Sequence, residues 1–144
     1  MEVANPDVPR WEHFAHDADM GVRGVGSTLA EAFEQGALAM TALITDLAAV
    51  AARDRVTIEC SAPDQELLFA EWLNNIVYEM AVRHMIFGRV VVTLDGTQLG
   101  ADIWGEHIDV QRHHPAVEVK GATYTALRVA QEASHWVAQT VVDI

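Results

Sequence analysis

The stretch TLAEAFEQGALAMTALITD, residues 28–46, decides the fold class because it predicts a long amphipathic helix. Thr28 and Glu31 form an S/T-x-x-E capping box at its start. Apolar side chains then recur at helical spacing, and the helix is expected to end near Asp46. A second helix, running to about Arg83, is predicted by apolar residues that follow one another every four positions: Leu68, Trp72, Ile76 and Met80.

Strand patterns surround the two helices. Residues 53–60 alternate between apolar and polar side chains, and residues 89–94 form a β-branched run closed by the turn signal Asp95-Gly96. Further extended segments are expected at residues 11–27, 99–103, 117–129 and 135–143. Two helices provide too few crossover connections for a parallel sheet of about seven strands. The sequence therefore predicts an α+β domain in which both helices pack on one mostly antiparallel sheet.

Length and composition favour one folded domain. The chain has 144 residues, 51% of them apolar, and domains centre on roughly 100–150 residues. Residues 1–10 are expected to form a flexible leader, and residues 11–144 the domain. The single cysteine, Cys60, excludes an intramolecular disulfide, and neither an export signal nor an apolar run of membrane-spanning length is visible. A cytoplasmic location is therefore expected.

Charge restricts the partners that this chain can bind. There are 21 acidic and 9 basic residues, the formal net charge is −12, and Lys120 is the only lysine. Because proteins bind nucleic acids largely by neutralising phosphates with Lys and Arg, we expect no autonomous nucleic-acid binding, and no docking to an anionic membrane. An acidic surface suits a basic protein partner or metal cations, and it equally serves solubility.

Two acidic stretches are candidates for a metal site. His16-Asp17-Ala18-Asp19 separates two extended apolar segments, and a strand-like run near the other end of the sequence finishes in Asp143-Ile144. Carboxylate oxygens are the ligands that Mg²⁺ and Ca²⁺ prefer, and the backbone of Ile144 would add a terminal carboxylate. A solvated turn and a frayed end are the simpler interpretations of these stretches.

A third segment, residues 105–114, is dense in acidic, basic and ligand groups, with Glu106, Asp109, Arg112 and His113. Its spacing is not that of a structural zinc site, and the sequence contains no nucleophile elbow, phosphate loop or dinucleotide fingerprint. We therefore do not expect the chain to be an enzyme. Lys120 is a fourth candidate, either as a solvated edge residue or as a compact point charge for a partner.

Several short motifs follow one another along the chain. They are His16-x-Ala18-Asp19-x-Gly21, Thr28-Leu-x-Glu31-Ala-Phe33, Ala39-Met-x-x-Leu-Ile-Thr-Asp46, Leu67-Leu-x-x-x-Trp72-Leu-Asn74, Gly105-Glu-x-x-Asp109-x-x-Arg112-His113, Val119-Lys-x-x-Thr123-Tyr124 and the terminal Asp143-Ile144. Together they resemble the archease family, whose first signature is H-T-A-D-x-G. The resemblance covers residues 11–144.

This resemblance implies a function. Archeases activate the RtcB-type RNA ligase in tRNA splicing and RNA repair: they promote guanylylation of the ligase by GTP and permit multiple turnover. The resemblance implies a divalent-metal site (calcium, magnesium or manganese) at Asp19, Asp143 and the terminal carboxylate of Ile144, with Lys120 as the activating lysine. Six further residues are candidates for supporting this site: His16, Asp17, Glu106, Asp109, Arg112 and His113.

The chain departs from the family pattern at Asp17, where Thr is common, and at Thr125, where many members carry His. Two other functions stay open. One is a free-standing metal-dependent phosphoester hydrolase that uses His16, Asp19, Glu106 and His113. The other is a general chaperone or adaptor, for which the helix faces and the acidic surface would suffice.

Overall fold

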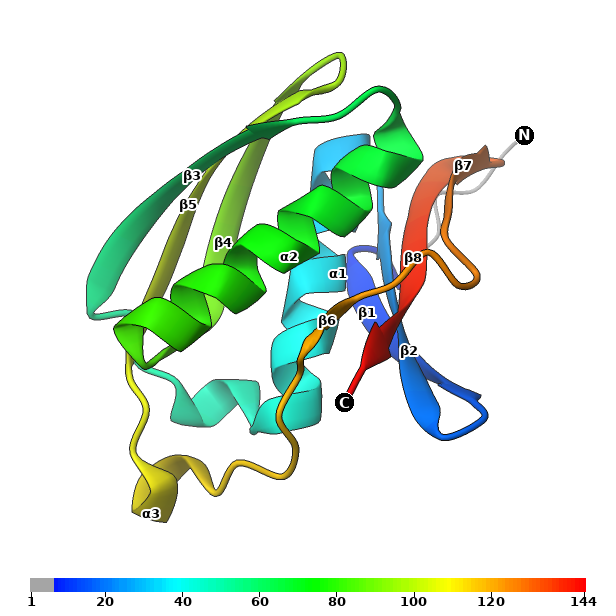
Figure 1. Cartoon of the computed structure of the whole chain (residues 1–144). Helices are drawn as coiled ribbons and strands as arrows, with labels where there is room; N and C mark the ends of the chain where they lie inside the picture. The colour runs from blue at the N-terminus through cyan, green and yellow to red at the C-terminus, as the bar shows by residue number, and fades with distance from the viewer. Residues whose placement is uncertain (1–6) are drawn as a thin grey trace.

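The structure, a computed structural model, describes residues 7–144 (Figure 1). In chain order the elements are β1 (Arg10–His16), β2 (Asp19–Gly26), α1 (Leu29–Ile44), the 3-10 turn η1 (Leu47–Ala49), β3 (Asp54–Ser61), α2 (Gln65–Arg83), β4 (Met85–Asp95), β5 (Gln98–His107), α3 (Val110–His113), β6 (Gly121–Ala122), β7 (Arg128–Glu132) and β8 (His135–Asp143). The predicted leader, residues 1–10, falls largely outside the described residues and stays a prediction, although Arg10 already belongs to β1.

The strands form two antiparallel sheets. The first sheet has the order β1-β2-β8-β6, with β7 also paired to β8, and the second has the order β3-β5-β4. The helices α1 and α2 contact strands of both sheets and lie between them (Figure 1). The predicted α+β class is confirmed, and the strands divide between two sheets where one was expected.

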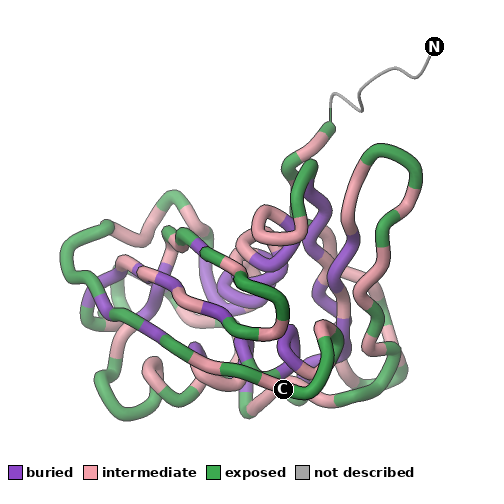
Figure 2. The backbone as a smooth tube through the Cα atoms, turned by 90° about the horizontal axis from the view of Figure 1, so that it is seen from above, coloured by how far each residue is buried: buried purple, intermediate pink, exposed green. Residues whose placement is uncertain are grey.

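Side chains cap the start of both long helices, and the cap of α1 is the predicted one. The Glu31 backbone N–H donates to the Thr28 hydroxyl at 3.1 Å, and the Leu67 N–H donates to Asp64 at 2.8 Å. The helices are joined in the core by Trp72, whose indole N–H donates to the Phe33 carbonyl at 2.9 Å. Figure 2 shows the buried stretches gathered where helices and strands meet, with exposed stretches at the loops and hairpin tips.

One glycine sets how closely α1 approaches the first sheet. A Cβ at Gly24 would lie 2.0 Å from the Ala32 carbonyl oxygen and 2.3 Å from the Gly36 nitrogen. Both atoms belong to the backbone of α1 and cannot move aside, so only glycine permits this contact between helix and strand.

The prediction of one long strand over residues 117–129 is wrong. Only residues 121–122 and 128–132 are strand, because the chain between them turns against β8. The Thr123 hydroxyl donates to the Val141 carbonyl, the Val141 N–H donates to the Thr125 carbonyl, and Ala126 has a φ of 55°. In the residues that the structure describes, no helix is long and apolar enough to span a bilayer.

Candidate functional site

The end of β8 lies between β2 and β6 and brings the two predicted acidic stretches together. The β2–β8 register ends with Met20 opposite Val142, and Asp19 and Asp143 are the next residues at these two strand ends. Residues with the same alternation along neighbouring strands point to the same face of the sheet, so the two carboxylates share one face. We call this pair of carboxylates, together with Ile144, the acidic edge.

Lys120 lies beside the acidic edge on the other neighbour of β8. Its backbone N–H donates to the Asp143 carbonyl at 2.8 Å, immediately before Gly121 pairs with Asp143 in β6. The side chain of Ile144 packs against the core, which holds the end of β8 against the fold. Residues far apart in the sequence therefore meet at one end of the first sheet, near the C-terminus in Figure 1.

The acidic edge carries two carboxylates that have no salt-bridge partner among residues 7–144. Within the described part of the chain, the ion pairs include neither Asp19, Asp143 nor Lys120. Two carboxylates that lie close together without a counterion repel one another. Their oxygens are hard ligands, which fit Ca²⁺, Mg²⁺ or Mn²⁺ and not a thiolate-seeking metal.

Side chains alone do not complete a metal site at this edge. Over residues 7–144, no group of three or more His, Cys, Asp or Glu side chains is arranged to hold a metal ion. Asp19 and Asp143 supply at most two carboxylate ligands, so a cation held here would complete its coordination with backbone oxygens or water.

His16 and Asp17 form one side of the turn between β1 and β2. His16 pairs with Asp19 in the β1–β2 register, which places His16 beside the acidic edge. The side chain of Asp17 is 94% exposed, and its φ is 51°. Asp adopts this left-handed conformation more readily than a β-branched residue does. The backbone at position 17 therefore favours Asp over the Thr that is common in the family pattern.

Glu106, Asp109, Arg112 and His113 form a separate cluster around α3. Arg112 donates to Glu106 Oε1 at 2.5 Å, Arg53 lies 3.3 Å from the same oxygen, and the Ala51 N–H donates to Oε2 at 2.8 Å. The Arg112 hydrogen bond is the main reason that the pKa of Glu106 is lowered to about 2, and the Ala51 and His113 hydrogen bonds add to it against the opposing effect of burial. Glu106 is therefore a buried anion at neutral pH.

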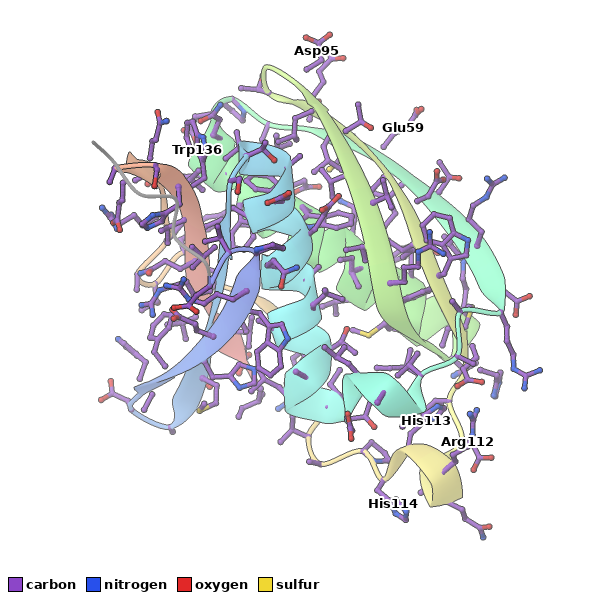
Figure 3. All side chains as sticks on the ribbon, turned by 180° about the vertical axis from the view of Figure 1, so that it is seen from behind. Glu59, Asp95, Arg112, His113, His114 and Trp136 are labelled. Atoms are coloured by element: carbon purple, nitrogen blue, oxygen red, sulfur yellow. The ribbon has the colours of Figure 1, made fainter. Side chains whose placement is uncertain are left out.

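The same cluster fixes the proton of His113. The Asp109 N–H donates to His113 Nδ1 at 2.8 Å, so the neutral ring carries its proton on Nε2 and donates to Glu106 at 3.0 Å. The Asp109 carboxylate caps α3 by accepting from two backbone N–H groups, those of Gln111 and Arg112. With every member committed to a partner, this cluster anchors α3, which Figures 1 and 3 place well away from the acidic edge.

An apolar groove of about 500 Å³ lies next to Lys120, and the sequence did not reveal it. It is bounded by the end of α2, the start of β4 and residues 115–120, with Val77, Met80, Met85, Val117 and Val119 in its lining. The spacing of apolar residues predicted that Met80 lies on the apolar face of a helix and that residues 117–119 belong to a strand. Only the way in which these distant segments pack in the fold shows that a groove remains between them.

Comparison with known proteins identifies a family and a fold. The model of the Archease protein family (MTH1598/TM1083) matches residues 11–144. The chain is 37% identical over 140 residues to protein archease of Thermococcus gammatolerans and 35% identical to that of Pyrococcus furiosus, covering in each case 94% of this chain and 99% of the relative.

Solved structures with the same fold include Protein 1598 of Methanobacterium thermoautotrophicum, with a TM-score of 0.78 and 27% identity over 95% of this chain and all of that one. A second is an archease of Thermotoga maritima, described as a possible chaperone, with a TM-score of 0.60 and 15% identity over all of this chain and 99% of that one. At 15% identity, the second comparison bears on the fold alone.

Proposed function

The chain belongs to the archease family, and from this premise we propose that it is an accessory protein that activates an RtcB-type RNA ligase. It promotes guanylylation of the ligase by GTP, permits multiple turnover in tRNA splicing and RNA repair, and does not itself join RNA ends. The observation that supports the proposal is the acidic edge, where the neighbouring strand ends of β2 and β8 carry Asp19 and Asp143, and the Lys120 backbone bonds to Asp143.

In this proposal Asp19, Asp143 and the terminal carboxylate of Ile144 hold one divalent cation. The cation supplies positive charge that triphosphate oxygens can approach. The three carboxylates keep it at the end of the sheet, where a partner can reach it, because Asp143 is exposed and Asp19 only half-buried. GTP is a substrate of the ligase, and we assign it no pocket in this chain.

Lys120 provides a second, independent contact with the partner. It is exposed and in no ion pair within residues 7–144, so its ammonium group is available to a phosphate or an acidic ligase group. The adjacent apolar groove adds surface that a docked protein would bury. Cation, lysine and groove together make one end of the molecule suited to a protein partner.

The hydrolase alternative has less support. It needs Glu106 and His113 to act together with His16 and Asp19, but the two pairs lie at separate corners of the fold (Figures 1 and 3). Both oxygens of Glu106 already accept hydrogen bonds. The pair at α3 is therefore not free to activate a water molecule at Asp19.

A chaperone or adaptor role is the second candidate, and the apolar groove favours it. A client bound through the groove would not depend on the carboxylates of the acidic edge. Client binding that is unaffected by changes at Asp19 and Asp143 is therefore the result that this alternative predicts.

The deciding experiment mixes the protein, at a substoichiometric ratio, with an RtcB-type ligase, GTP and Mn²⁺, and follows covalent attachment of the guanylyl group. The proposal predicts several guanylylated ligases per molecule of activator. Asp19→Asn and Asp143→Asn should each abolish this stimulation without unfolding the protein. Glu59→Gln, which removes one exposed charge far from the acidic edge, is the matched control. Full stimulation by both Asn variants would refute the site.

A further inference from the structure

The outer face of the second sheet carries a row of side chains that is separate from the acidic edge, the cluster around α3 and the apolar groove. In β3 and β5, the side chains on the same side of the sheet as Val56 and Ile103 point to the core. The alternate residues face away from the helices, and no other element covers them in Figures 1 and 3. This outer face is therefore a solvent-facing sheet surface.

Three residues form a row across this surface. Arg55 of β3 and Arg89 of β4 are both opposite Trp104, which lies on the central strand β5. Arg89 places its guanidinium carbon 4.6 Å from the centre of the Trp104 ring system, and both arginines are exposed. We call these three residues the Arg–Trp–Arg row.

The two arginines of the row are exceptional in this chain. Among the described residues, every other arginine has a carboxylate partner at 3.3 Å or closer: Arg10, Arg23, Arg53, Arg83, Arg112 and Arg128. Within residues 7–144, Arg55 and Arg89 have no carboxylate partner, in a chain whose acidic residues outnumber its basic ones by 21 to 9. Two guanidinium groups left without carboxylates on either side of one indole are available to an anion from outside.

We propose that the Arg–Trp–Arg row binds one nucleotide unit of a single-stranded nucleic acid. The phosphate accepts hydrogen bonds from the N–H groups of Arg55 and Arg89, and the base stacks on the layer that Arg89 forms with Trp104. Nucleotides combine an anion with a flat ring, as the row combines guanidinium groups with an indole. An acidic peptide matches the charge but not the stacking surface, so a nucleotide is the better fit.

The remaining rows of the same face limit the length of the ligand. Asp102 lies on β5 in the next row, and Glu59 and Asp95 lie at the far end of the sheet (Figure 3). A long strand that followed the sheet would meet these carboxylates. The row therefore engages one unit, and this proposal narrows the expectation of no autonomous nucleic-acid binding to long tracts, which the net charge of −12 disfavours. The site includes no residue of the acidic edge and does not depend on the ligase proposal.

The experiment titrates the full-length protein with a fluorescein-labelled hexauridylate and, in parallel, with hexaglutamate and with inorganic phosphate. Hexauridylate should bind, with a slope of log K against log salt of about −0.7 for one neutralised phosphate, and the Trp104 indole N–H resonance should shift. The double variant that combines Arg55→Gln and Arg89→Gln should bind hexauridylate about tenfold or more weakly, because each substitution removes charge-assisted hydrogen bonds.

Arg83→Gln is the matched control, since Arg83 lies on α2 and is paired with Glu79. It should leave hexauridylate binding unchanged. Equal binding of hexaglutamate would overturn the assignment to nucleotides, and equal binding of inorganic phosphate would overturn the stacking part of it. Binding that survives the double substitution, or no binding of hexauridylate, would overturn the site itself.

Discussion

Asp143→Asn should be slightly more stable than the natural chain without metal, and less stable than the natural chain when metal is saturating. In metal-free solution the variant loses one of two like charges at the neighbouring ends of β2 and β8, one position beyond the Met20–Val142 pair. Directly opposed like charges destabilise a sheet by about 0.2–1 kcal/mol, and the exposure of Asp143 places the effect in the lower part of this range. Without metal, the free energy of unfolding of the variant should therefore be slightly higher than that of the natural chain.

Saturation with Ca²⁺ should favour the natural chain. At a cation concentration one hundred times the dissociation constant, binding stabilises the folded state by about 2.7 kcal/mol. If the loss of one carboxylate weakens binding about a hundredfold, the same concentration stabilises the variant by only about 0.4 kcal/mol. The natural chain then exceeds Asp143→Asn by about 1–2 kcal/mol, or roughly 2–8 °C in Tm for a chain of this size.

The assay is thermal unfolding followed by circular dichroism, once with a chelator and once with Ca²⁺ at the concentration fixed by calorimetry. Asp19→Asn should behave like Asp143→Asn, whereas Glu59→Gln should gain as much from Ca²⁺ as the natural chain. If Ca²⁺ raises the Tm of all three variants equally, the two carboxylates do not share a cation.

Three further predictions concern single groups. Lys120→Gln should reduce stimulation of ligase guanylylation about tenfold or more at an unchanged Tm, while Arg83→Gln leaves stimulation intact; normal stimulation by Lys120→Gln would remove the lysine from the interface. Residues appended after Ile144 turn its terminal carboxylate into an amide and should weaken Mn²⁺ binding in calorimetry, so an unchanged affinity excludes it as a ligand. The pKa of Glu106 is lowered from 4.5 to about 2, so its ionised form stabilises the fold above pH 4.5 and loses this effect as the pH falls toward 2. The stability difference between the natural chain and Glu106→Gln in urea unfolding should therefore shrink over this interval, and a constant difference would contradict the cluster.

Local patterns were sufficient to predict the two long helices. The capping box at Thr28 and the four-residue spacing from Leu68 to Met80 describe interactions between near neighbours in the sequence, so the helices begin and end close to the predicted residues. The one-turn helix α3 was missed, because it consists of four residues and depends on the hydrogen bonds of Asp109 and His113.

The division into two sheets could not be predicted from periodicity. Alternation shows which side of a strand is apolar but does not show which strand is its neighbour. A site shared by Asp19 and Asp143 was implied by the family resemblance, and the β2–β8 pairing brings the ends of their strands together, with Met20 opposite Val142 as the last pair. The Arg–Trp–Arg row depends in the same way on pairing, since Arg55, Arg89 and Trp104 come from three strands and form no motif in the sequence.

The most direct test of the central claim is paramagnetic broadening of backbone amide resonances by a small amount of Mn²⁺. If one cation is held at the acidic edge, broadening should centre on Asp19, Lys120 and Asp143, and the amides of residues 106–113 should stay sharp. Broadening centred on Glu59 and Asp95, or distributed over the acidic surface without a centre, would contradict a shared cation between the ends of β2 and β8.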